Sequence, residues 1–328
     1  MNRVIQKNTS IDPYAETLYK FLNRRYPNGN YHAVYEAGFS GFSAVRELER
    51  LGINCIVTHP ADVPTKQKER MSKSDRVDAK KLSRSLGNGE LEGIYIPDEI
   101  CEEYRYSARQ RYALIKDQTR LKNRIKSALY YFGINTPFEL EGRRWSGQYI
   151  KWLSSIRFKT EYAQYAFSNN IQRLIQLRHD LSHVLKTMKT MVNNTAGSMS
   201  PVYKYLISVP GIGPITAIAL LTEIMDINRF KHVDNLVSYI GLSPSVTSSD
   251  TRETDHGITR RRNKYLRSML IEAAWTASAK DPVLTMKFGQ LCRRMDKNKA
   301  IVHIAKKLVS RIRYVWKNQK PYVTGVIN

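Results

Sequence analysis

Three carboxylates in the first quarter of the chain have the residue types and spacing of a metal-binding set. Glu36 ends an otherwise apolar predicted strand, and Asp75 and Asp78 are three residues apart, so on a helix they project from one face. Converging carboxylates repel one another unless a hard cation neutralises them, and Mg²⁺ binds both carboxylates and substrate phosphates. Two such ions can activate the attacking oxygen and stabilise the leaving oxygen of a phosphodiester. The alternative is a helix cap, in which Ser74 precedes a first turn that favours acids.

A serine-rich segment, residues 243–250, precedes a cluster of basic side chains. A serine hydroxyl can attack phosphorus if it loses its proton and if arginine holds the phosphate charge. His256 is the only imidazole nearby. The alternative is an exposed polar loop without chemistry. The basic side chains that follow the segment are Arg260, Arg261, Arg262, Lys264 and Arg267.

Two further patterns point to the backbone of a nucleic acid. Gly211 and Gly213, in a Pro-Gly-Ile-Gly turn between two predicted helices, resemble a helix-hairpin-helix element, in which backbone amides approach a phosphate at a helix N-terminus. The alternative is a tight helix–helix turn. The second pattern is a basic stripe that falls within about 100° of arc on a long predicted helix. The stripe consists of Arg105, Arg109, Lys116, Arg120 and Arg124.

A heptad seam follows on the next long predicted helix, where apolar residues recur at alternating intervals of three and four. Its members are Leu174, Leu177, Leu181, Val184, Met188 and Met191. Two interpretations stay open at this point. The seam either closes an antiparallel helical hairpin within one chain or forms a coiled coil that dimerises the protein.

The charge of the chain is large and unevenly placed. Its 328 residues include 53 Lys and Arg against 29 Asp and Glu, a formal net charge of +24. Residues 1–100 carry a net charge of +2 and residues 201–250 one of −1, whereas residues 101–200 carry +10 and residues 251–328 carry +13. A polyanion would relieve this self-repulsion, and nucleic acid is the leading candidate.

Composition excludes several other classes of protein. Hydrophobic residues make up 42% of the chain, too many for wholesale disorder. The longest apolar stretch, residues 209–221, is shorter than the roughly 20 residues of a membrane span and contains prolines and glycines. No signal segment follows Met1, and the three cysteines are widely spaced, so we expect a cytoplasmic protein without disulfides.

Strand and helix signals alternate over residues 1–97, which predicts an α/β layer with a mixed sheet, and the rest of the chain is predicted to be mainly helical. The first part is predicted to hold strands over 3–7, 31–35, 54–58 and 93–96 and helices over 15–26, 43–51 and 75–86. Two long helices are expected within 98–194, with a loop over 136–149 between them. The remainder is predicted as helices over 202–208, 215–224, 233–240, 258–279, 283–294 and 299–317, with a polar loop over 241–257.

Taken in order, short motifs across the whole chain resemble those of the DEDD transposases of insertion sequence family 110, relatives of the Piv and MooV invertases. The motifs are Tyr35-Glu36-Ala37-Gly38, residues 73–79, residues 209–213, Gly241-Leu242-Ser243-Pro244, Ser248-Ser249, residues 257–260 and residues 298–302. The resemblance implies a RuvC-like (RNase H fold) domain over 1–97, a coiled-coil region over 98–195 and a C-terminal transposase domain over 196–328. It also implies Mg²⁺, DNA, a structured bridge RNA that guides the enzyme, and dimers that pair into tetramers in a prokaryotic, nucleoid-associated setting.

Carried over by position, the resemblance makes Glu36, Asp75 and Asp78 the second, third and fourth metal-binding acids and Ser249 the nucleophile, with Ser248 as its rival. The first acid of the family lies on an opening strand for which this sequence has no counterpart before Tyr35. We therefore expect a catalytic domain that lacks its first strands and impaired strand transfer. A non-catalytic nucleic-acid-binding remnant and a junction-resolving nuclease are the alternative functions.

Overall fold

The computed structural model describes residues 9–65, 74–194, 199–249, 252–259 and 262–325. The chain divides into two compact units, residues 1–98 and residues 99–328, and each is described by itself. None of the described helices combines the length and the apolar composition that a membrane crossing requires.

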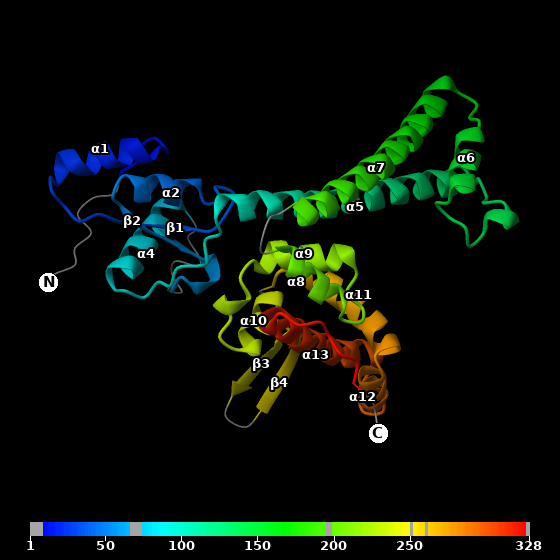
Figure 1. The fold of residues 1–328 in the computed structure, drawn as a ribbon. Helices are drawn as coiled ribbons and strands as arrows, with labels where there is room; N and C mark the ends of the chain where they lie inside the picture. The colour runs from blue at the N-terminus through cyan, green and yellow to red at the C-terminus, as the bar shows by residue number, and fades with distance from the viewer. Residues whose placement is uncertain (1–8, 66–73, 195–198, 250–251, 260–261, 326–328) are drawn as a thin grey trace. The chain divides into compact units, whose positions relative to one another are not determined.

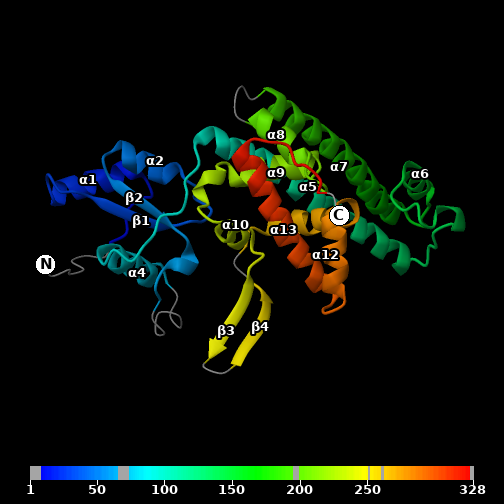
Figure 2. The same ribbon diagram turned by 60° about the horizontal axis from the view of Figure 1, so that its bottom comes forward.

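The N-terminal unit is built on a parallel pair of strands. The described elements are α1 (Ala15–Arg25), β1 (His32–Glu36), α2 (Ser43–Arg50), β2 (Asn54–Thr58) and α4 (Asp75–Gly87). His32 pairs with Asn54 and Glu36 with Thr58, and α2 crosses over between the strands, as parallel pairing requires. Figure 1 and Figure 2 show α1 and α2 on one side of the strands and α4 on the other.

Six predicted elements of this unit can be compared with the structure. The helices over 15–26, 43–51 and 75–86 and the strands over 31–35 and 54–58 are confirmed to within one residue at each end. The strand predicted over 93–96 is wrong, since the segment makes a single backbone hydrogen bond to the sheet, from Ile94 N to Val57 O at 2.8 Å. The strand predicted over 3–7 lies outside the described residues. The described part of the sheet has two parallel strands.

The second unit starts with an antiparallel helical hairpin. It consists of α5 (Glu99–Tyr131) and α7 (Glu161–Asn194), with α6 (Gly147–Ser155) at its far end (Figure 1). The segment predicted as a loop over 136–149 therefore ends inside a short helix. Leu174 of the heptad seam packs with Leu121 and Ile125 of α5, and Met188 packs with Ala108. The seam thus closes a hairpin within one chain, the first of the two interpretations.

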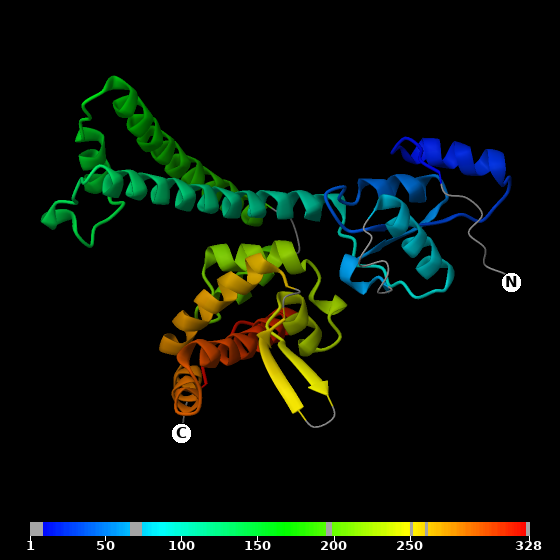
Figure 3. The ribbon, with the colours of Figure 1, turned by 180° about the vertical axis from the view of Figure 1, so that it is seen from behind.

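A bundle of helices completes this unit, seen from behind in Figure 3. Its helices are α8 (Met199–Ile207), α9 (Pro214–Ile224), α10 (Val233–Ile240), α11 (Lys264–Lys280), α12 (Pro282–Cys292) and α13 (Lys297–Asn318). Helices α9, α11 and α13 supply most of the buried apolar core, and α5 packs on α9. The hairpin and the bundle therefore form one packed body.

A β-hairpin interrupts the bundle where the sequence predicted a polar loop and the start of a helix. Strands β3 (Pro244–Ser249) and β4 (Arg252–Ile258) pair antiparallel, and Figure 2 shows them extending from the bundle. The polar loop over 241–257 is therefore wrong, as is the helix start at residue 258. Threonine favours strands, whereas serine favours turns, so the composition of this segment alone does not indicate a hairpin.

Candidate active site

Two of the three predicted acids meet at one lysine. The Lys81 ammonium lies 3.0 Å from Oδ1 of Asp78 and 3.5 Å from Oε1 of Glu36. Glu36 comes from the end of β1 and Asp78 from the first turn of α4, so the packing of α4 beside β1 brings them together. The Lys81 side chain is only 9% exposed, whereas the two carboxylates keep about a third of their surface exposed, at 31% and 33%.

The electrostatics of this lysine follow from its neighbours. Burial lowers the pKa of Lys81, but the hydrogen bond and charge of Asp78, with those of Glu36, outweigh burial and leave that pKa above its ordinary value. The lysine is therefore held as a cation between two anions. Sequence reasoning missed it, although its spacing of three from Asp78 on a helix is a usable signal.

Asp75 stands apart from this pair. It is the first residue of α4 and is exposed, and the side chain of the preceding Ser74 accepts a hydrogen bond from Val77 N at 3.4 Å. Ser74 therefore caps the N-terminus of α4, as the alternative interpretation of this segment predicted. Within the described ranges, no three His, Cys, Asp or Glu side chains gather into a metal-binding group. The predicted three-acid set is thus present as a converging pair and a separate third acid.

The donor chemistry of the pair fits a hard divalent cation. Both groups are carboxylates, the ligand type that Mg²⁺ prefers, and both already contact one positive charge. The Lys81 ammonium touches the same oxygens that a metal would use. A divalent ion and this lysine would therefore compete for Glu36 and Asp78.

The predicted nucleophile lies in the second unit, on the β3–β4 hairpin. Ser249 is the last residue of β3 and pairs with Arg252, and Ser248 pairs with Glu253. Register alone does not separate the two serines by role. Of the basic residues predicted to follow, Arg260 and Arg261 lie outside the described residues.

The described basic residues at the base of this hairpin form a positive surface. Arg262 and Lys264 are exposed, and Arg267 donates to Thr259 O at 3.1 Å. Burial first, and then the charge of Arg262, lower the pKa of the Arg267 guanidinium. Two guanidinium groups therefore lie close enough to repel each other, which an anion between them would relieve.

The two glycines predicted to bind phosphate have different surroundings. Gly211 has a φ of +90°, and a Cβ added there would lie 2.3 Å from Ala273 O, so this glycine allows α11 to pack closely. Gly213 caps the N-terminus of α9, and an added Cβ would meet no atom within 4 Å. Gly211 thus has a packing role, whereas the helix start at Gly213 is open.

The predicted basic stripe on α5 is divided by the fold. Arg105 and Arg109 face α9, where Arg109 makes a bidentate pair with Glu223 at 2.7 and 2.9 Å. Arg105 donates to the backbone oxygens of Thr222 and Glu223, both at 3.3 Å. Both arginines therefore anchor the hairpin to the bundle. Lys116, Arg120 and Arg124 are exposed, and Arg120 pairs with Asp117.

Glu223 is a second charged residue that sequence reasoning missed. Its side chain is fully buried, and Asn263 Nδ2 also donates to its carboxylate, at 2.8 Å. Asn263 caps α11 directly after the serine hairpin. Glu223 thus joins α5, α9 and the root of that hairpin. The sequence did contain a signal, since Glu223 is the only charged residue of the largely apolar helix α9. A charge that is buried in such a helix needs charged or polar partners.

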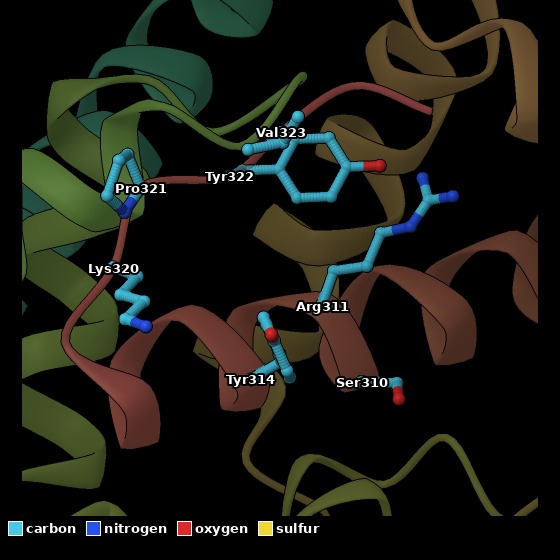
Figure 4. Close-up of a pocket in the computed structure, with 7 residues that line it drawn as sticks. All are labelled: Ser310, Arg311, Tyr314, Lys320, Pro321, Tyr322 and Val323. Carbon is cyan, nitrogen blue, oxygen red and sulfur yellow. The ribbon is translucent and has the colours of Figure 1, made fainter. Parts of the chain in front are cut away.

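A large surface pocket of about 660 Å³ lies elsewhere in the second unit, between the end of α13 and the tail that follows it (Figure 4). Its two strongest polar groups are already engaged, since Arg311 and the Tyr322 hydroxyl each contact Oδ2 of Asp281 at 2.7 Å. Asp281 is fully buried and caps α12. The polar groups of this pocket therefore stabilise the fold by holding Asp281, and none of the predicted catalytic residues lines it.

Comparison with known proteins matches both units to one group of enzymes. A model of the DEDD transposases of the IS110 group matches residues 11–132, and the model described as "Transposase IS116/IS110/IS902 family" matches residues 203–290. The first match includes the acids and Lys81, and the second includes the serine hairpin and Glu223.

Individual relatives agree. A putative transposase of Sinorhizobium fredii, y4qE, is 29% identical over 242 residues, which are 74% of this chain and 57% of that protein. The transposase of insertion sequence element IS1533 from Leptospira borgpetersenii is 26% identical over 334 residues, 98% of this chain and 91% of that protein. The transposase of element IS1111A from Coxiella burnetii is 31% identical over 122 residues, 36% of this chain and 34% of that protein. With both family models matched in order, this chain belongs to the IS110 family of DEDD transposases.

Proposed function

We propose that this protein cleaves and exchanges DNA strands for an insertion sequence, with Mg²⁺ at the acids of the N-terminal unit and a serine of the β3–β4 hairpin as nucleophile. The observation that carries this is the convergence of Glu36 and Asp78 on one cationic position. Family membership supplies the reaction class, a DNA transposase. The positive surface at the base of the hairpin, where Arg262 is exposed and Arg267 is partly exposed, supports binding of the DNA backbone by the same hairpin.

In this proposal Glu36 and Asp78 would hold the metal, and Asp75, which is separate from them in the structure, would be the third acid. When bound, Mg²⁺ neutralises phosphate charge and activates an attacking oxygen. The ammonium of Lys81 holds the two carboxylates together, and it would compete with a bound metal for both of them. This lysine therefore keeps the acids in place at low metal concentration and lowers the affinity for the metal.

The serine step exchanges one phosphodiester bond for another. The Oγ atom of Ser249, or of its neighbour Ser248, bonds to phosphorus and gives up its proton to a base. The bond from phosphorus to a deoxyribose oxygen breaks, and that oxygen takes up a proton. Arginine side chains neutralise the charge that develops on phosphorus. A deoxyribose hydroxyl of a second strand then attacks phosphorus and loses its proton. The bond from phosphorus to the serine Oγ breaks, Oγ takes up a proton, and a DNA phosphodiester is restored.

The remaining parts of the proposal follow the family. The unit over 1–97 would be a RuvC-like (RNase H fold) domain, residues 98–195 a coiled-coil region, and residues 196–328 the transposase domain. A structured bridge RNA would pair with donor and target DNA, and homodimers would pair into tetramers in the prokaryotic nucleoid. The regions of +10 and +13 net charge are the proposed nucleic-acid surfaces, including Lys116, Arg120, Arg124, Lys264 and the segment with Arg260 and Arg261.

Covalent capture of a labelled DNA strand tests the chemistry. We expect Mg²⁺-dependent capture that is lost in Ser249→Ala, kept in a matched Ser245→Ala variant, and lost in Glu36→Gln. Loss in Ser248→Ala instead would move the nucleophile by one residue. Cleavage that survives both serine changes would indicate a junction-resolving nuclease. Binding without capture or cleavage in the parent protein would indicate a non-catalytic binding protein.

A further inference from the structure

Exposed aromatic rings gather at the far end of the helical hairpin, where α5 ends and the connection to α6 begins. Four of them, Tyr130, Tyr131, Phe132 and Phe138, form what we call the tip platform. Tyr131 and Phe138 are each 84% exposed. Figure 1 and Figure 3 show this end of the hairpin directed away from the helical bundle of the same unit. Exposed apolar patches of this kind mark binding surfaces.

The platform rests on a rigid base. Tyr131 packs edge-on against Phe132 at 5.0 Å between ring centroids, and Phe132 packs edge-on against Phe158 at 4.9 Å. Phe158 in turn packs at a tilt against the buried Phe167 at 5.1 Å. Phe167 belongs to the core that joins α5, α6 and α7. Tyr131 and Phe132 are thus connected to the core by a chain of aromatic contacts, so these two rings lose little conformational entropy when they bind a flat partner.

The surroundings of the platform are positively charged. Residues 122–165 contain 8 Lys and Arg against 3 Asp and Glu, a net charge of +5. Lys126 and Arg144 line a hollow of about 200 Å³ together with Tyr130, and Glu141 is the one acid among its lining residues. Arg143 and Arg144 are exposed within the same connection. Cations beside exposed rings favour a partner that is both flat and anionic.

We propose that the tip platform binds an unpaired DNA strand. Bases of such a strand stack on aromatic rings, and its phosphates are neutralised by neighbouring lysine and arginine. DNA is the polyanion on which a transposase acts. A second copy of the chain is a poorer occupant, because two tips of the same positive charge repel each other. Bases inside a duplex are stacked already, so duplex DNA does not use the rings.

Fluorescence anisotropy with a labelled 20-nucleotide strand and the full-length protein tests this. The double variant Tyr131→Ala with Phe138→Ala should bind the single strand at least about 10-fold more weakly, because stacking contributes roughly a factor of ten per base. It should bind a duplex of the same sequence as well as the parent protein does. The control Tyr106→Ala removes an equally exposed ring at the other end of α5 and should change neither affinity.

A second variant separates lost stacking from lost folding. Tyr131→Phe with Phe138→Tyr keeps both rings and should bind the single strand like the parent protein. Equal weakening of single-strand and duplex binding in the alanine variant would overturn the proposal, as would unchanged single-strand binding. If RNA binds more tightly than DNA and the alanine variant loses that binding, the partner is RNA instead of DNA. If the alanine variant has a lower molecular mass than the parent protein in light scattering, the surface joins copies of the chain. Ser249→Ala should bind the single strand normally, so this test is independent of the proposed serine chemistry.

Discussion

In the N-terminal unit one cation lies between two carboxylates, whereas in the helical unit one carboxylate lies between two guanidinium groups. Lys81 joins Glu36 and Asp78, and Glu223 joins Arg105 and Arg109. The first cluster keeps its carboxylates about one-third exposed, while the Glu223 side chain is fully buried. The two clusters therefore use the same chemistry at different depths.

Depth decides what each cluster can do. A buried carboxylate has lost its hydration and depends on partners that remain in place, so its cluster holds the fold together. A cluster at the surface is partly hydrated and exchanges its cation at modest cost, because ion pairs in contact with water contribute little. The Glu223 cluster thus suits a structural joint, and the Lys81 cluster suits a site where one cation replaces another.

The largest expected effect breaks the buried cluster. Glu223→Gln removes the charge that two arginines share and should lower the free energy of unfolding of the helical unit by about 3–5 kcal/mol. All four tryptophans, Trp145, Trp152, Trp275 and Trp316, lie in this unit, so urea unfolding followed by tryptophan fluorescence reports on it. The control Glu272→Gln changes an exposed glutamate on α11 and should have little effect. Equal stability of the two variants would contradict a structural role for Glu223.

A smaller effect comes from removing one partner. Arg109→Met leaves Glu223 with Arg105 and Asn263 and should lower the free energy of unfolding by about 2 kcal/mol, the cost of losing a bidentate bond to a buried acceptor. The matched change Arg120→Met, on the same helix, removes an exposed pair with Asp117 and should cost less than about 1 kcal/mol. If Arg120→Met lowers the free energy of unfolding as much as Arg109→Met does, burial of the partner carboxylate does not decide how much an ion pair contributes. Urea unfolding measures both.

The surface cluster should respond to substitution in metal affinity more than in stability. Lys81→Met removes the competing ammonium, and Mn²⁺ measured by calorimetry should then bind on the order of tenfold more tightly, a difference of about 1.4 kcal/mol. Lys80→Met changes the exposed neighbour and should leave the affinity unchanged. Weaker Mn²⁺ binding in Lys81→Met would show that the lysine supports the metal site. No Mn²⁺ binding in the parent protein would remove the proposed metal site itself.

Much of the fold follows from local sequence patterns. The strand at residues 54–58 and the helix at residues 75–86 are marked by apolar runs, a serine cap and a following turn, and the structure has both. The β3–β4 hairpin could not be predicted in this way, because its Ser and Thr residues carry turn and strand signals at once. Its strands form through backbone pairing with each other, which composition does not encode.

Local sequence patterns also predicted the candidate site only in part. The spacing of Asp75 and Asp78 predicted two acids on one helical face, but their unequal roles depend on where β1 ends beside α4. The stripe on α5 predicted a face that binds nucleic acid. Arg109 keeps 54% of its side chain exposed but is paired with the buried Glu223 of the facing helix. Periodicity identifies a face of a helix and leaves open what packs on it. Pairings between residues more than a hundred positions apart require the tertiary structure.

The smallest expected effect is a loss of stability at alkaline pH, caused by the Tyr265 phenol near the buried Glu223 cluster. Burial first, with a smaller contribution from Glu223, raises the pKa of Tyr265 to about 12, while Arg111 opposes the shift. The folded state therefore favours the neutral phenol. Its contribution to stability is complete below the ordinary tyrosine pKa of about 10 and is lost as the pH rises through about 12. Urea midpoints at pH 9 and 11 should fall more for the parent protein than for Tyr265→Phe, and the exposed-site control Tyr106→Phe should behave like the parent. Equal losses in the parent and Tyr265→Phe would show that the pKa of Tyr265 is not raised by its buried position near Glu223. The contrast in depth between the two clusters would then rest on Glu223 alone.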